Sequence, residues 1–181
     1  AEPVMGEGGI IVPPREYFRE VKPVLDRHGT LFLADEVQCG FGRTGRMFAV
    51  EHYGVEPDIM TMAKGIADGF PLSCFIARPE VADSFRPGDH LSTFGGNPVS
   101  CAAALANIAF FEREKLPEKA AAKGERLMAE LRELAKRRKL IGDVRGAGLM
   151  VGVELVKDAA KTPAADEAGK ASFWELVGSG Y

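Results

Sequence analysis

The chain has 181 residues, of which 46% are hydrophobic and 27% charged, a composition typical of ordinary globular proteins. Its net charge of −3 argues against a nucleic-acid-binding role, because such proteins usually carry a basic face. The three cysteines form no CxxC pair and the three histidines show no ligand spacing, so we expect reduced thiols and no metal. Without a membrane-length apolar stretch or a signal peptide, we expect a cytoplasmic protein, or a mitochondrial one in a eukaryote.

The first 30 residues predict a loop followed by a helix. Proline and glycine break any regular pattern over residues 2–9, and the two acids there, Glu2 and Glu7, are most simply solvated loop charges. A helix is predicted to begin at Pro13, because proline is favoured in a first turn, and to stop before Gly29.

Two apolar runs end in charged side chains, and this pair predicts a site. Residues 31–37 are typical of a buried parallel strand that ends in Asp35 and Glu36, and residues 59–63 predict a second strand that ends at Lys64. Open α/β sheets bind ligands at such strand ends. A lysine and an acid match the needs of pyridoxal phosphate, which takes a lysine Schiff base at its aldehyde and an acid at its pyridinium nitrogen. Taken alone, however, Lys64 is more simply an ordinary surface lysine.

Residues 40–45 formally match the dinucleotide-binding pattern GxGxxG. A dinucleotide site would need a sound helix directly afterwards and an acid about 20 residues further on. The following segment, residues 46–53, is short and is closed by Gly54. We therefore interpret the glycines as turn residues and rank an oxidoreductase last among the candidate functions.

The next part of the chain predicts a third strand at residues 73–77, a short helix at 79–85 and a longer helix from Val99 to about Glu112. Asn97 is a good N-cap for this last helix. The Thr and Gly residues before it, among them Thr93, could offer a hydroxyl and backbone N–H groups to a phosphate. A plain helix cap explains the same residues equally well.

The last part predicts an amphipathic helix over residues 116–136, two strand-like runs that end near Val156, and a poorly patterned helix at 166–177. Leu127, Leu131 and Leu134 share the apolar face of the amphipathic helix. The change in pattern near residue 115 indicates that a second, smaller domain begins there.

Five segments resemble, as an ordered set, the class III aminotransferases: EPVMGEGG, LFLADEVQCGFGRTG, PDIMTMAKGIADGFPLS, STFGGNPVSCAAA and IGDVRGAGLMVGVELV. The residues of these motifs most resemble those of the alanine–glyoxylate aminotransferase 2-like branch. The resemblance implies a fold-type I pyridoxal phosphate enzyme of the α/β class. Residues 1–114 would be part of its large, mostly parallel cofactor-binding domain, and residues 115–181 the start of its small α+β domain. Members of this family are well over twice as long, so we expect a fragment.

The resemblance also implies a role for each candidate at the cofactor. Lys64 would form the Schiff base and then shuttle the substrate proton. Asp35 would pair with the pyridinium nitrogen, which makes the ring an electron sink. Val37 would pack on one ring face, and Gln38 would lie near the 3′ oxygen of the ring.

Three further residues would act at the edges of this site. Thr93 would reach the cofactor phosphate of the partner subunit, so that a homodimer shares its active sites. Glu2 and Glu7 would lie near the substrate entrance, where Glu7 resembles the acid that pairs with the arginine for the substrate carboxylate.

The function implied is ping-pong transamination between an amino acid or amine and a 2-oxo acid, with glyoxylate and pyruvate as candidate acceptors. A phospho-lyase or racemase of the same family would share Lys64 and Asp35, and a non-catalytic remnant is the competing reading. The family's phosphate loop, ring-stacking aromatic residue and carboxylate-binding arginine should lie outside the chain, and residues 171–181 do not resemble the family. We therefore expect the chain alone to be inactive.

Overall fold

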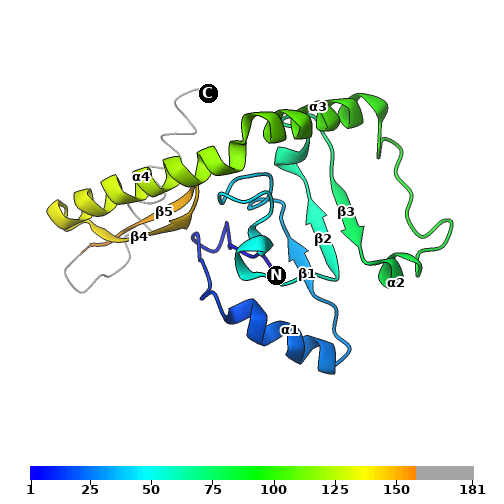
Figure 1. The fold of residues 1–181 in the computed structure, drawn as a ribbon, viewed down its shortest axis with the longest axis horizontal. Helices are drawn as coiled ribbons and strands as arrows, with labels where there is room; N and C mark the ends of the chain where they lie inside the picture. Colours follow the sequence, from blue (N-terminus) through cyan, green and yellow to red (C-terminus); the bar gives the residue numbers. More distant parts are fainter. Residues whose placement is uncertain (158–181) are drawn as a thin grey trace.

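A computed structural model describes residues 1–157, which form helices and two small sheets (Figure 1). The elements, with η for a 3-10 helix, are α1 (Tyr17–Arg27), β1 (Leu33–Asp35), η1 (Ala49–Tyr53), β2 (Ile59–Met62), η2 (Lys64–Ile66), β3 (Cys74–Ala77), α2 (Pro79–Ala82), α3 (Pro98–Glu114), α4 (Leu116–Arg137), β4 (Ile141–Ala147) and β5 (Met150–Leu155). The helix predicted at residues 166–177 lies outside the described residues.

The first sheet has the order β1-β2-β3. Strands β1 and β2 are parallel, with Asp35 opposite Thr61, and β3 runs antiparallel to β2, with Cys74 opposite Met62. The predicted parallel pair is therefore confirmed. Because β1 and β2 point the same way, the residues that follow them emerge at one edge of the sheet.

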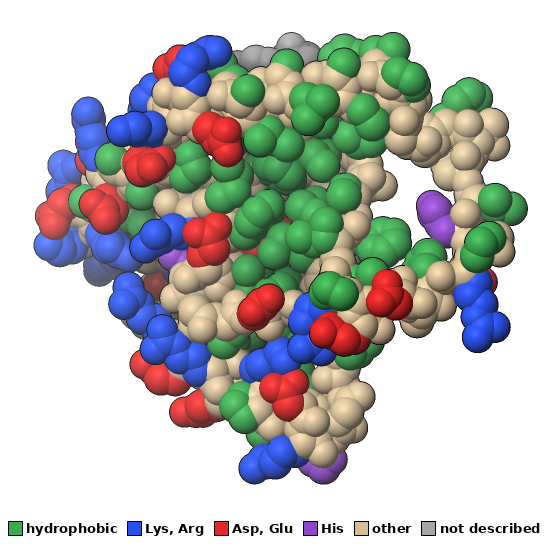
Figure 2. Space-filling model, turned by 45° about the vertical axis from the view of Figure 1, so that its right-hand side comes forward, with side chains coloured by type: hydrophobic (Ala, Val, Ile, Leu, Met, Phe, Trp, Pro, Cys, Tyr) green, Lys and Arg blue, Asp and Glu red, His purple; other side chains and the backbone are tan. Residues whose placement is uncertain are grey.

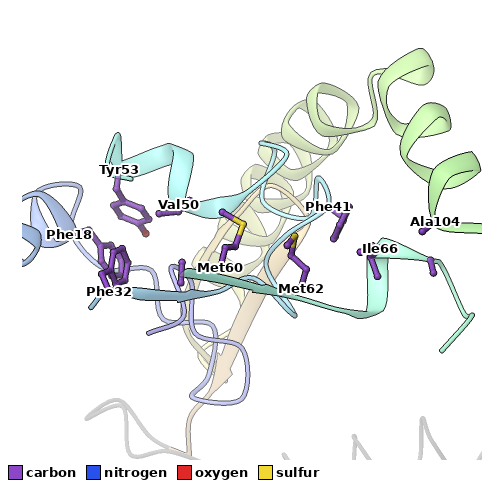
Figure 3. Packing of buried hydrophobic residues seen from close by; sticks show 11 residues of the cluster. Phe18, Phe32, Phe41, Val50, Tyr53, Met60, Met62, Ile66 and Ala104 are labelled. Atoms are coloured by element: carbon purple, nitrogen blue, oxygen red, sulfur yellow. The ribbon is translucent and has the colours of Figure 1, made fainter. Parts of the chain in front are cut away.

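A cluster of buried apolar side chains lies along β2 between α1, η1 and α3 (Figure 3). At one end Phe18 stacks on Phe32 with ring centroids 5.3 Å apart and meets Tyr53 edge-on at 4.8 Å. The Tyr53 hydroxyl donates to the Pro3 carbonyl at 2.8 Å. This bond gives the buried hydroxyl the hydrogen-bond partner that it would otherwise lack. This end of the core thus ties the N-terminal segment to the sheet.

The other face of the sheet is largely uncovered, and this corrects one expectation. The run at residues 31–37 was expected to be buried, but only its alternate residues Phe32, Ala34 and Glu36 are, while Leu33 is 38% exposed. Phe75 on β3 is 46% exposed. In Figure 2 hydrophobic side chains gather on one face of the molecule. Leu33 and Phe75 lie on the same face of the sheet by the strand register, so β1 shows the alternation of a half-buried strand.

Helix α1 begins at Tyr17, later than the expected start at Pro13. A residue that precedes a proline is disfavoured in the α conformation, and Pro13 precedes Pro14. The chain instead forms a turn in which the Tyr17 N–H donates to the Pro14 carbonyl at 3.1 Å. The proline pair therefore delays the helix by one turn.

Helices α3 and α4 begin close to the expected positions. The Asn97 side chain accepts a hydrogen bond from the Ser100 N–H at 2.9 Å, which confirms the predicted N-cap. On α4 the packed face is shifted from the expected leucine face. Leu131 and Leu134 are half-buried and Leu127 is 40% exposed, whereas Gly124 and Met128 are buried.

The second sheet is an antiparallel hairpin of β4 and β5, with Arg145 opposite Gly152. Helix α4 lies along this hairpin (Figure 1). Gly124 makes the close approach possible, since a Cβ there would collide with the Gly148 carbonyl at the hairpin turn. The proposed domain boundary at residue 115 stays a prediction.

Two general properties of residues 1–157 bear on function. None of their helices is both long and apolar enough to cross a bilayer. Among the same residues, His, Cys, Asp and Glu side chains form no group of three or more that could hold a metal ion. The cysteines Cys39, Cys74 and Cys101 are free thiols.

Candidate active site

Asp35 and Lys64 follow neighbouring parallel strands and emerge at the same edge of the sheet. Asp35 is the last residue of β1 and lies opposite Thr61 of β2. The ladder continues one step further, where the Glu36 N–H donates to the Thr61 carbonyl at 2.9 Å. Lys64 opens η2 directly after β2 ends. Asp35 and Lys64 therefore follow the C-terminal ends of two neighbouring parallel strands, the position that the sequence predicted for them.

The backbone of Lys64 adopts a left-handed conformation, with φ at 49°. A non-glycine residue rarely occupies this region, and such strain is concentrated at functional sites and turns that their surroundings enforce. Gly65 follows, and a Cβ there would lie 3.0 Å from the Cβ of Phe41. The turn after β2 is thus held tightly against the loop that follows β1.

Asn107 of α3 holds the same turn from the other side. Its side-chain amide donates to the carbonyl oxygens of Gly65 at 2.7 Å and Ile66 at 3.2 Å. No role is predicted for Asn107 from the sequence. The available signal was an amide side chain in the middle of a helix otherwise rich in alanine and apolar residues, where polar side chains need a reason to be partly buried.

A cavity of about 330 Å³ lies between these segments. Three predicted site residues, Val37, Gln38 and Lys64, line it together. Asn107 and the α3 aromatics Phe110 and Phe111 also contribute to its wall. The cavity is therefore partly apolar, and its polar lining holds the charged residues Lys64, Arg43 and Asp68 beside the two side-chain amides.

Asp35 does not line this cavity but lies half-buried beside it. One of its carboxylate oxygens, Oδ1, accepts a hydrogen bond from the Val37 N–H at 3.0 Å. This local bond shapes the chain between Asp35 and the two cavity residues that follow. The acid thus sets the direction in which Val37 and Gln38 leave the strand.

Glu36, the second acid of the strand end, is completely buried and has a structural task. Its Oε1 accepts from the Val50 N–H at 2.8 Å, and its Oε2 accepts from the Ala49 N–H at 3.0 Å and from the Cys39 thiol at 3.2 Å. Burial raises the pKa of Glu36 above its ordinary value, although the two backbone bonds oppose the rise. Burial, reinforced by the Glu36 charge, also raises the pKa of Cys39.

The glycine-rich segment after Glu36 is a packing loop. Gly42 and Gly45 have φ values of 80° and 92°, and Gly45 lies against Ala121 of α4. A 3-10 helix, η1, follows instead of the longer helix that a dinucleotide site needs. The structure therefore agrees with the interpretation of these glycines as turn residues.

The predicted entrance acids lie on the N-terminal loop, and one of them reaches the cavity lining. Glu2 Oε2 accepts from the Gly6 N–H at 2.6 Å, which folds the loop back on itself. Gln38 Nε2 lies 3.4 Å from Glu7 Oε1, a long hydrogen bond. Glu7 and Gln38 are thus brought together, whereas Glu2 acts within its own loop.

Thr93 is not brought to the cavity. It lies on the exposed segment between α2 and α3, which projects from the body of the molecule (Figure 1). Its neighbours Leu91 and Phe94 are the large apolar residues with the most exposed side chains within residues 1–157. Within one copy of the chain, therefore, the sheet-edge residues and the phosphate-binding candidate are separate.

Comparisons with known proteins place the chain in a family. The family model for class III aminotransferases matches residues 1–176. A leucine/methionine racemase from Thermococcus litoralis is 50% identical, over 94% of this chain and 39% of its own length. An acetylornithine aminotransferase from Methanothermobacter thermautotrophicus is 49% identical, over 85% of this chain and 40% of its own length.

Solved structures agree with this assignment. The crystal structure of a Bacillus anthracis aminotransferase superposes with a TM-score of 0.90 at 42% identity, over 97% of this chain and 40% of that one. The chain spans about 40% of the length of the curated relatives it matches. Its fold is that of part of a fold-type I transaminase, and the chain belongs to the class III aminotransferases.

Proposed function

We propose that this chain carries the part of an aminotransferase active site that contains the Schiff-base lysine. The site uses pyridoxal phosphate, the cofactor of its family. The observation that carries the proposal is the position of Lys64. It occupies a strained turn at the mouth of a cavity that Val37 and Gln38 line, at the same sheet edge as Asp35. A strained lysine in such a setting is a functional candidate in its own right.

The residues present fit this cofactor. An amine, a carboxylate one strand away and an apolar wall are the groups that a pyridoxal ring requires. When bound, the cofactor supplies an electron sink for the carbon that loses its proton. In the proposal Lys64 holds the cofactor aldehyde and moves that proton, and Asp35 keeps a proton on the ring nitrogen. Val37 packs on the ring face, and Gln38 donates to the ring oxygen.

The substrate end of the proposed site is the N-terminal loop. The contact between Glu7 and Gln38 supports this role, because it brings the Glu7 carboxylate next to a residue that lines the cavity. In the proposal Glu2 shapes the loop and Glu7 faces the substrate. Thr93 serves the cofactor phosphate of a second copy in a homodimer, which its exposed position on a projecting segment supports.

The proposed reaction transfers an amino group from an amino acid or amine to a 2-oxo acid. Glyoxylate and pyruvate are the acceptors proposed on the resemblance to the alanine–glyoxylate aminotransferase 2-like branch, and that branch stays a prediction. N-acetylornithine is a donor to test first, because a relative 49% identical is an acetylornithine aminotransferase.

The experiment is a half-reaction. The chain is incubated with pyridoxal phosphate and N-acetylornithine, and then with a broader panel of amino acids. The carbonyl product is quantified, which is an aldehyde for N-acetylornithine, because only its terminal amine is free, and an oxo acid for the other amino acids. Sustained turnover is not expected from the chain alone, but a single half-reaction should release up to one equivalent of product per chain, and none from Lys64→Ala. A Lys119→Ala variant, changed at an exposed lysine of α4, should match the unaltered chain. A chain that binds cofactor at Lys64 but releases no carbonyl product from any donor supports the non-catalytic reading.

Racemisation is a second candidate, because a relative 50% identical is a leucine/methionine racemase. The same preparation incubated with L-leucine or L-methionine separates the two functions. A racemase yields the D-amino acid without net oxo acid, whereas an aminotransferase yields oxo acid in proportion to the amino groups transferred. Inversion without oxo acid would replace transamination as the proposed function.

A further inference from the structure

The Arg145 side chain joins two segments that are far apart in the sequence. From β4, its Nε and Nη2 both donate to the carbonyl oxygen of Gly9, at 2.9 and 2.7 Å. Its Nη1 donates to Asp143 Oδ2 at 2.9 Å and to Glu154 Oε2 at 2.7 Å. One guanidinium therefore binds both strands of the hairpin through Nη1 and holds the N-terminal loop through Nε and Nη2.

An apolar contact reinforces this connection at the same point of the hairpin. Gly152 lies opposite Arg145 in the β4–β5 register, and a Cβ on Gly152 would lie 3.0 Å from the Cβ of Ile10. Ile10 also packs against the buried cluster that includes Val4 and Met150. The hairpin thus contacts Gly9 through the Arg145 guanidinium. It contacts Ile10 at Gly152, where the absence of a side chain leaves a notch for Ile10.

The segment held in this way is the loop that carries Glu7. The N–H groups of Gly9 and Ile10 both donate to the Gly6 carbonyl, at 3.1 and 3.2 Å, and Met5 and Ile11 pair across the loop. Because Glu7 lies inside this closed turn, the position of its carboxylate depends on where Gly9 is anchored.

Glu7 in turn meets Gln38 of the cavity lining. A continuous series of contacts therefore runs from Arg145 through the Gly9 carbonyl and the Glu7 carboxylate to the Gln38 amide. Its two ends are separated by about 100 positions in the sequence, and they belong to the hairpin and to the end of strand β1.

We propose that Arg145 is a positioning residue that anchors the loop carrying Glu7 to the hairpin and thereby sets the geometry of Gln38 at the cavity. The link from the loop to the cofactor rests on the proposed function, whereas the anchoring of the loop does not. Arginine suits the task because its planar fork makes four of these bonds at once, which the three donors of a lysine cannot reproduce.

The anchor is tested by amide hydrogen exchange, followed by mass spectrometry, on peptides that cover residues 2–11. Three variants are compared with the unaltered chain: Arg145→Met, Arg145→Lys and Gly152→Ala, the last of which fills the notch against Ile10. Arg126→Met is the matched control, because Arg126 is 82% exposed on α4 and its ion pair within residues 1–157 is with Glu130 of the same helix.

The anchor predicts exchange about tenfold faster over residues 2–11 in Arg145→Met, because the two hydrogen bonds that hold the Gly9 carbonyl are lost. Gly152→Ala and Arg145→Lys should accelerate the same peptides, and Arg126→Met should not. Peptides from α4 and from the β1–β2 sheet should keep their protection, which shows that the chain still folds. Unchanged exchange over residues 2–11 in Arg145→Met would overturn the proposal.

A second readout tests the transmission to the cavity. The dissociation constant of pyridoxal phosphate is measured for Arg145→Met, Gln38→Ala and the double variant. If Arg145 acts through Gln38, each single variant weakens binding and the double variant weakens it no further than the stronger single one. Independent, additive losses would refute the transmission. A chain that does not bind the cofactor at Lys64 would refute the proposed function, while the exchange experiment would still decide the anchor.

Discussion

The side-chain amide of Asn107 lies 2.7 Å from the carbonyl oxygen of Gly65, the residue directly after Lys64. The same side-chain nitrogen, Nδ2, also donates to the Ile66 carbonyl oxygen at 3.2 Å. Helix α3 therefore holds the strained turn at Lys64 from outside the sheet. Without this donor, two carbonyl oxygens of a tight turn would lose their partner in a partly buried place.

Replacing Asn107 by leucine, which has a similar size and no donor, is predicted to relax the Lys64 turn. The loss of two bonds to partly buried carbonyls should lower the free energy of unfolding by about 1–3 kcal/mol, as measured by urea denaturation. The rate at which pyridoxal phosphate modifies Lys64 should also fall, and by more than the loss of global stability alone would cause.

The control for that substitution is Ala109→Leu, which adds a leucine at an exposed position of the same helix. It should leave both the stability and the Lys64 modification close to those of the unaltered chain. If Asn107→Leu behaves like this control, the amide does not hold the turn.

Glu36→Gln is predicted to destabilise the loop after β1. Both carboxylate oxygens accept backbone N–H groups, so the amide nitrogen of glutamine must face a donor, and one bond is lost at a cost of about 1–3 kcal/mol. Urea denaturation measures this difference.

The same substitution should change the pH dependence of stability. Because burial raises the pKa of Glu36, its contribution to stability is fully present below its ordinary value of about 4.3 and is lost as the pH rises through the raised pKa. The advantage of the unaltered chain over Glu36→Gln should therefore be largest near pH 4 and shrink at higher pH. A difference that grows with pH would contradict this assignment.

His52 predicts a pH dependence of the opposite sense. Burial lowers its pKa below 6.5, although its Nε2, 3.1 Å from the Thr44 carbonyl oxygen, opposes the shift. The unfolded chain then binds the proton more readily, so stability should fall as the pH is lowered from about 6.5 towards the lowered pKa. His52→Gln should lack this decline, while His28→Gln, changed at the exposed end of α1, should keep it. Parallel stability profiles for all three proteins between pH 5 and 8 would refute the prediction.

Much of this fold was predictable because local patterns determine it. The strand ends at Asp35 and Lys64 are marked by apolar runs that stop at charges, and the start of α3 is marked by Asn97 and Pro98, whose capping chemistry depends on few neighbours. The late start of α1 was also within reach, since the restriction on a residue before proline is local.

Other features depend on long-range packing, which no local pattern reveals. Leu33 is exposed because its side of β1 is not fully covered within the described residues. Gly124 is buried in place of Leu127 because the hairpin turn approaches α4 at Gly124. Asn107 and Arg145 have partners 42 and 136 positions away, so only the folded chain identifies their roles. The contribution of Thr93 in a partner subunit stays a prediction.

The central claim, that the chain builds its cofactor site around Lys64, is tested most directly by trapping the lysine. The purified chain is mixed with pyridoxal phosphate and reduced with borohydride, and the modified residue is identified by mass spectrometry beside Lys64→Ala and Lys119→Ala controls. The account predicts one label per chain, confined to Lys64, abolished in Lys64→Ala and retained in Lys119→Ala. Labels scattered over exposed lysines and unchanged by Lys64→Ala would contradict it.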